Sequence, residues 1–194
     1  MLDEFKLSEV KAGNGWWGNK QGIQAGMKYI DAFSIKNLDL QGELNYVRPF
    51  TYSHFDSVAN YSNYNQPLAH PLGANFTEAI GIIRYQPLPK WNMEAKLIVF
   101  RQGIDTTNTD YGSNIFILSG NRGADYGYKT GGGVRANGVN GSLWVGYELL
   151  ENLYIDASVM YRKVNVPAAM QLSQRSTLFS IGLRLNANRR QYDY

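Results

Sequence analysis

Apolar and polar residues alternate along this chain in segments that each have the length of a β-strand. In the clearest segment, 38–46, one face carries Leu38, Leu40, Gly42, Leu44 and Tyr46. Its other face carries Asp39, Gln41, Glu43 and Asn45. The same period of two recurs over 23–29, 92–99, 139–148, 155–162 and 179–186, while 76–85 is more apolar and 4–11 is a weaker first segment. No segment shows sustained apolar spacing at helical period, so the chain is predicted to be all-β with about eight strands.

The connections between these segments are predicted to be alternately short and long. The short ones lie around 33–35, 87–90 and 151–152, and the long ones cover 12–20, 49–75, 103–137 and 166–173. Outer-membrane barrels have short periplasmic turns and long outer loops, and a tilted strand crosses the bilayer in about 9–11 residues. We therefore expect a transmembrane antiparallel β-barrel, in contact with lipid, in the outer membrane of a Gram-negative bacterium. A soluble lipocalin-like barrel is the alternative fold, and solubility without detergent would distinguish it.

The composition favours strands and tight turns, with 20 Gly, 14 Tyr, 8 Phe and 4 Trp against 18% charged residues. Four tyrosines lie near expected strand ends, where an aromatic girdle would lie: Tyr46, Tyr85, Tyr147 and Tyr161. The absence of Cys excludes disulfides and thiolate metal ligands. The net charge of +3 comes from scattered basic residues, which argues against a nucleic-acid partner.

Catalysis and cofactor binding find little support in the sequence. His54 and Asp56 could supply half of a hydrolase triad, but no Ser in an elbow motif completes it. No metal-ligand spacing and no phosphate-binding loop occurs, so we expect no enzyme, metal or cofactor. The carboxylates on the polar face are expected to form an interior salt network: Asp39, Glu43 and Asp156, balanced by Lys28, Arg162 and Arg184.

The segment 43–78 is the most distinctive part of the chain. It reads YVRPFTYSH over 46–54 and NYSNYNQPLAHPLGANFTE over 60–78. Together with Glu43, these stretches resemble the Wzi-like capsule-assembly outer-membrane proteins, including the RemB-like gliding-motility proteins. The positions that carry the resemblance are Glu43, Val47, Arg48, Pro49, Tyr52, His54, Asn65, Gln66, Leu68, His70, Gly73, Asn75 and Glu78.

The resemblance implies a large closed barrel of which this chain is the C-terminal portion, although a complete eight-stranded barrel is also open. Residues 1–187 would be barrel strands and loops, and 188–194 a periplasmic tail. The implied function is a non-enzymatic surface protein that binds or anchors extracellular or capsular polysaccharide. The alternative is a barrel subunit of a gliding-adhesion or secretion assembly that acts through protein partners, with the tail as its docking element. A passive pore is a third, weaker hypothesis.

The loop within 46–78 holds the candidate site residues. Aromatic faces stack on sugar rings, while amides and imidazoles bind hydroxyl groups. The candidate polysaccharide ligands are Tyr52, His54, Tyr61, Tyr64, Asn65, Gln66, His70 and Asn75. In the alternative, the loop folds inward to brace the lumen, where Arg48, Glu43 and Glu78 form a network with the two histidines. Trp16 and Trp17 are either a carbohydrate platform or an interfacial anchor.

Overall fold

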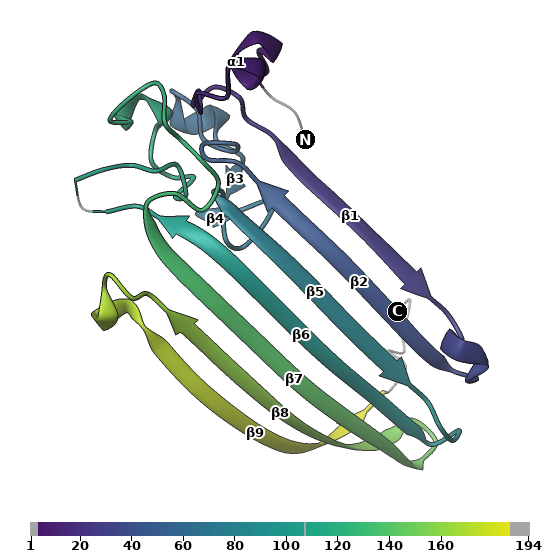
Figure 1. The fold of residues 1–194 in the computed structure, drawn as a ribbon. Helices are drawn as coiled ribbons and strands as arrows, with labels where there is room; N and C mark the ends of the chain where they lie inside the picture. Colours follow the sequence, from purple (N-terminus) through teal and green to yellow (C-terminus); the bar gives the residue numbers. More distant parts are fainter. Residues whose placement is uncertain (1–3, 107, 187–194) are drawn as a thin grey trace, which may run out of the picture.

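Seven long strands form one antiparallel sheet in the computed structural model, which describes residues 4–106 and 108–186. The strands are β1 (Gly22–Tyr29), β2 (Leu38–Val47), β5 (Phe76–Tyr85), β6 (Trp91–Ile104), β7 (Val134–Leu150), β8 (Leu153–Asn165) and β9 (Gln174–Leu185). Each strand pairs with the next long strand along the chain, as Figure 1 shows. The predicted all-β class is confirmed. Within the described residues β1 and β9 are the sheet's two edges, so the sheet is not closed into a barrel.

The other elements are short and lie in the connections. They are α1 (Leu7–Ala12), η1 (Ala32–Ser34), η2 (Ser57–Ala59), β3 (Ser62–Asn63), β4 (Gln66–Pro67), η3 (Ser119–Asn121) and η4 (Met170–Leu172). Over 4–106 and 108–186, no helix has the length and apolar character needed to cross a membrane. The proposed boundary at 187 and the tail 188–194 lie outside the described residues.

The expected first strand over 4–11 is wrong, because most of this segment forms the helix α1. The Val10 N–H donates to the Lys6 carbonyl at 3.2 Å, and Gly13 ends the helix with a left-handed φ of 65°. Alternation over so few residues does not separate a strand from one helical turn, and no neighbouring strand pairs with this segment. The long strands in the sheet are therefore seven rather than about eight.

The strand register confirms the alternation, because opposed residues share a face. One row that crosses the whole sheet contains only apolar residues: Tyr29, Leu40, Ile83, Ala95, Leu143, Val159 and Phe179. We call the face that carries this row the apolar face. Many of its large side chains are exposed, including Met27 and Ile181. A row on the opposite, polar face contains Asp39, Arg84, Glu94, Trp144, Ser158 and Ser180.

The two ends of the sheet differ in their connections (Figure 1). One end carries 30–37, 86–90 and 151–152, and the other carries 48–75, 105–133 and 166–173. The expected order of short and long connections is clear for the four connections between β2 and β8, whereas 30–37 and 166–173 are equally long. The connection predicted as 103–137 is shorter, because β6 extends to Ile104 and β7 begins at Val134.

Candidate functional site

The long connections pack on one another at one end of the sheet, together with residues 12–21. We call 12–21, 48–75 and 105–133 the loop cap. Backbone hydrogen bonds join its segments, since the Trp17 N–H donates to the Asp125 carbonyl at 3.0 Å and the Phe50 N–H donates to the Gly112 carbonyl at 2.9 Å. A sheet that is one layer thick has no second layer to bury its side chains, so the apolar cores lie in and beneath this cap. The first core contains Val47, Tyr52, Ala74, Phe76 and Ile115, and the second contains Trp17, Phe50 and Tyr128.

The second core shows where Trp17 lies. The Trp17 ring is buried, with its centroid 6.1 Å from that of Phe50 in an edge-on contact. The guanidinium of Arg122 lies 4.0 Å from the centroid of the Trp17 ring. Trp17 is therefore neither a free carbohydrate platform nor an interfacial anchor. It is a packing residue of the loop cap.

Asn75 joins the loop cap to the sheet from a completely buried position. Its Nδ2 donates to the carbonyls of Gly103 at 2.8 Å, Tyr111 at 3.1 Å and Gly132 at 3.0 Å. Its Oδ1 accepts from the Gly131 N–H at 2.8 Å. The backbone of Asn75 is left-handed, with a φ of 60°, a conformation that Asn tolerates better than most residues. Every polar atom of this side chain is therefore used internally, and Asn75 holds the loop cap on the sheet.

The outer part of 48–75 is a small hairpin formed by β3 and β4. Tyr64 and Asn65 make its two-residue turn, and their positive φ values of 47° and 57° are those of a type I′ turn. The Tyr64 side chain is 93% exposed, and Tyr61, Asn65 and Gln66 are also exposed. The Tyr61 N–H donates to the Tyr52 carbonyl at 3.0 Å, which attaches the hairpin to the cap core. The hairpin thus presents two tyrosines and the amides of Asn63, Asn65 and Gln66 to solvent.

A polar network lies on the polar face just below the loop cap. His70 Nδ1 accepts from the Leu72 N–H at 3.2 Å, so the ring proton is on Nε2, which donates to Glu78 Oε2 at 3.0 Å. The His70 ring also stacks on Phe76, with centroids 4.4 Å apart. Asn45 Nδ2 joins the two carboxylates, donating to Glu78 Oε2 at 3.0 Å and to Glu43 Oε1 at 2.8 Å. This arrangement matches the lumen-bracing hypothesis for Glu43, Glu78 and His70.

Other predicted site residues lie elsewhere. Arg48 donates to the carbonyls of Asn19 at 2.8 Å and Trp16 at 3.3 Å, so it fastens 12–21 and does not join the carboxylates. The backbone of His54 bonds with Asn60 and Ser119 in the cap. Tyr52 is buried, and this burial raises the pKa of its phenol. Of the eight polysaccharide candidates, the hairpin brings together only Tyr61, Tyr64, Asn65 and Gln66 at the surface.

Sequence reasoning missed the aspartates of 105–133. Asp105 accepts from the N–H groups of Tyr111 at 2.6 Å and Asn114 at 2.9 Å, which holds the loop in shape. Asp110 is buried with its Oδ2 unpaired within the described residues, and burial together with Asp105 raises its pKa to about 6. The sequence feature that could have predicted this turn is the pair Asp105 and Asp110 around a Thr- and Asn-rich stretch. Such a composition favours turns held by hydrogen bonds from side chain to backbone.

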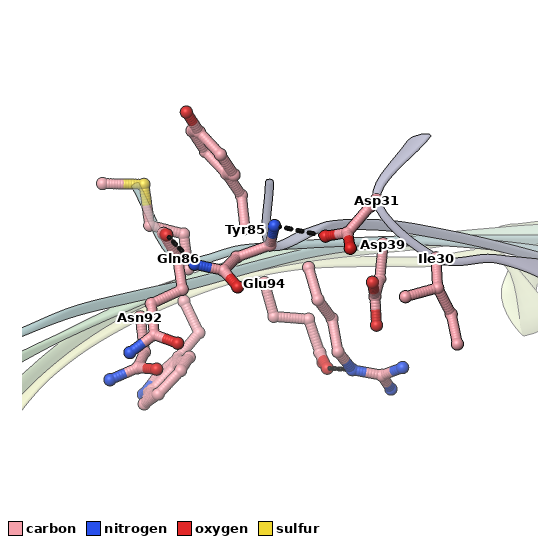
Figure 2. A pocket seen from close by; sticks show the side chains of 11 residues that line it. Ile30, Asp31, Asp39, Tyr85, Gln86, Asn92 and Glu94 are labelled. Atoms are coloured by element: carbon pink, nitrogen blue, oxygen red, sulfur yellow. Dashed lines mark hydrogen bonds and ion pairs between the residues drawn. The ribbon is translucent and has the colours of Figure 1, made fainter. Parts of the chain in front are cut away.

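A hollow with a volume of about 570 Å³ lies at the opposite end of the sheet (Figure 2). Figure 2 shows Asp39 and Glu94 on one side of the sheet and Tyr85 on the other. Two carboxylates that line the hollow are paired with cations, with Lys28 Nζ 2.8 Å from Asp39 Oδ2 and Arg84 Nε 2.7 Å from Glu94 Oε2.

On the polar face, at β8 and β9, Arg184 Nε lies 2.6 Å from Asp156 Oδ2. The predicted salt network is therefore confirmed for Lys28 with Asp39 and for Arg184 with Asp156. Arg162 instead donates to Asn140 Oδ1 at 3.1 Å. Among the described residues, no group of three or more His, Asp or Glu could hold a metal ion.

The fold and this site establish only the structural class of the protein. It is an all-β protein built on one antiparallel sheet with a packed loop cap. Comparison of the chain with protein-family models, with curated proteins and with solved structures finds no match.

Proposed function

We propose that this chain forms part of an outer-membrane β-barrel whose outer loops hold extracellular polysaccharide without catalysing a reaction. The observation that carries the proposal is the apolar face, which extends across all seven strands and leaves large side chains exposed. An apolar surface of this extent needs a cover, because monomeric soluble proteins rarely expose one. The polar face, with its paired charges, is suited to a barrel interior.

The height of the apolar face also supports a membrane location. On β8 the apolar positions run from Leu153 to Tyr161. They cover ~27 Å along the strand, or about 21 Å of height at a tilt of about 40°. The apolar band of outer-membrane barrels is about 25 Å tall. Trp91 and Tyr147, with ring centroids 4.8 Å apart, lie near the end of the face opposite the loop cap, where an aromatic girdle belongs.

The direction of the edge strands favours a larger barrel. In a meander of seven antiparallel strands, β1 and β9 run in the same direction. Bacterial single-chain barrels have an even number of antiparallel strands. Closing this sheet in an antiparallel way therefore takes an odd number of further strands, in agreement with the larger barrel that the resemblance to Wzi-like proteins implies.

The hairpin of β3 and β4 is the best candidate for contact with polysaccharide. Tyr64 and Tyr61 offer exposed aromatic faces for stacking, and Asn65 and Gln66 offer amide donors and acceptors. The two-residue turn holds Tyr64 at the tip without burying it, so the ring is presented before any ligand arrives.

The test is binding of purified protein to an array of capsular and other bacterial surface polysaccharides. The variant is Tyr61→Ala/Tyr64→Ala, and the control is Tyr126→Ala, which removes an exposed tyrosine from 105–133. Truncating an aromatic anchor costs more than about 1 kcal/mol, so the double variant is expected to bind more than about 30-fold more weakly. Equal binding by the double variant and the control would contradict the role of the hairpin.

A second candidate function is a barrel subunit of a gliding-adhesion or secretion assembly. It is favoured by apolar side chains that lie exposed in the same loop, namely Phe55, Val58 and Leu68. Such side chains are typical of protein contacts rather than of polysaccharide contacts. Co-purification of a partner that is lost in Phe55→Ser/Leu68→Ser but kept in Tyr61→Ala/Tyr64→Ala would favour this function.

A further inference from the structure

Charge is distributed unequally between the two faces of the sheet. The acidic residues of the seven long strands all lie on the polar face: Asp39, Glu43, Glu78, Glu94, Glu148 and Asp156. The charged residues of the apolar face are all basic: Arg101 on β6, Arg135 on β7, Lys163 on β8 and Arg175 on β9. We call these four residues the basic band.

The register places the basic band near the ends of β6 to β9 that lie beside the loop cap, and Lys163 is opposite Val139, four residues from Arg135. Arg101 is opposite Asn137, which lies two residues after Arg135, and Lys163 is directly opposite Arg175. On β6 and β8 the cation directly follows the last apolar position of this face, whereas on β7 and β9 one polar residue, Asn137 or Thr177, lies between them. On β8, for example, Lys163 follows the apolar positions that run from Leu153 to Tyr161. The order along the strand is therefore apolar surface first and positive charge next.

The cations of the basic band have no acidic partners within the described residues. All four side chains are exposed, and Arg175 makes a contact with the Tyr161 ring at 5.4 Å from its centroid. Like charges that face each other across two strands, as Lys163 and Arg175 do, are destabilising. On the polar face, by contrast, Lys28, Arg84 and Arg184 each lie against a carboxylate. An external anion would remove the repulsion.

We propose that the basic band binds the phosphate groups of membrane lipids whose acyl chains cover the apolar face. This inference rests on the proposed membrane location. A phospholipid has the same order as the strands, with apolar chains followed by a phosphate at the boundary with water. An acidic glycan or an acidic protein segment would use the cations but leave the apolar rows beneath them uncovered. The matching order of apolar surface and charge therefore favours a lipid.

The experiment compares two lipids and two matched variants of the full chain. Detergent-solubilised protein is titrated with short-chain phosphatidylglycerol, which is anionic, and with phosphatidylcholine, which is zwitterionic, and bound lipid is counted by native mass spectrometry. The variant is Lys163→Gln/Arg175→Gln. The control, Lys96→Gln/Arg162→Gln, removes one Lys and one Arg from the polar face, on β6 and β8. Flotation with phosphatidylcholine vesicles measures membrane insertion separately.

Wild type and control are expected to prefer phosphatidylglycerol, and Lys163→Gln/Arg175→Gln is expected to lose about 30-fold of that preference, at about five-fold for each basic residue. High salt should reduce the preference of the wild type in the same way. If the variant keeps the wild-type preference, or if wild type binds both lipids equally while it floats with vesicles, the inference is overturned and the membrane location stands. Failure of the wild type to float would instead overturn the membrane location.

Discussion

Replacement of Asn75 by Ala tests whether one side chain holds the loop cap on the sheet. The amide has two N–H groups shared among three carbonyls, and its Oδ1 accepts one further bond. Counted as three hydrogen bonds to groups that stay buried, their loss costs about 3 kcal/mol. Ala in a left-handed conformation costs about 1 kcal/mol more. We expect Asn75→Ala to destabilise the closed cap by about 4 kcal/mol.

Asn152→Ala is the matched control for the backbone. Asn152 has nearly the same left-handed φ, 64° against 60° for Asn75. It lies in the turn between β7 and β8, and its exposed side chain makes no hydrogen bond within the described residues. Asn152→Ala therefore loses only the backbone preference, about 1 kcal/mol. The difference of about 3 kcal/mol between the two variants isolates the side-chain hydrogen bonds of Asn75.

Amide hydrogen exchange is the assay, because the cap can open without global unfolding. The reporters are the backbone amides of Gly103 and Gly131, which bond to Asn75 itself, and of the adjacent Gly132. In Asn75→Ala these amides should exchange roughly 150-fold faster than the backbone cost alone predicts. This factor follows from the loss of about 3 kcal/mol, since each 1.4 kcal/mol corresponds to a tenfold change. Gly adopts the left-handed conformation without strain, so the closed cap should be about 1 kcal/mol more stable in Asn75→Gly than in Asn75→Ala. Equal exchange of the cap in Asn75→Ala and Asn152→Ala would refute the reasoning.

Two further predictions concern the same cap. Asp110 has a pKa of about 6 against an ordinary 3.8, so its stabilising contribution is full below pH 3.8 and is lost as pH rises through 6. The protection of the cap amides against exchange should then fall by up to about 3 kcal/mol between pH 4 and pH 7.5. The variant Asp110→Asn should remove this pH dependence. Protection that rises over this pH range would contradict the prediction. Gly103→Ala places a methyl group against the Gly132 carbonyl and the Asn75 amide and should cost about 1–3 kcal/mol in urea unfolding, while Gly141→Ala, with open space at that position, should have little effect.

The strands could be predicted from the sequence because their signal is local. A period of two fixes which residues share a face, and every row of the sheet follows once neighbouring strands are paired. The row from Tyr29 to Phe179 is the direct outcome of that pattern. The segment 4–11 was wrongly predicted to be a strand, because six helical residues carry too little periodicity to distinguish them from a strand.

The loop cap could not be predicted, since its contacts join residues far apart in the chain. The partners of Asn75 lie at Gly103 and Gly132, and those of Arg48 lie at Trp16 and Asn19. No spacing within 43–78 reveals such partners. The contact between His70 and Glu78 was part of one of the two interpretations of this loop, because both residues lie in one segment and have complementary chemistry.

The most direct test of the proposed membrane location is a cysteine scan of β8, which the chain allows because it contains no Cys. Single cysteines are placed at successive positions from 155 to 162 of vesicle-inserted protein and labelled with a fluorophore, and quenching from lipid and from water is compared. We predict strict alternation, with lipid quenching at Ile155, Ala157, Val159 and Tyr161 and water quenching at Asp156, Ser158, Met160 and Arg162. Water quenching at every position would contradict the account.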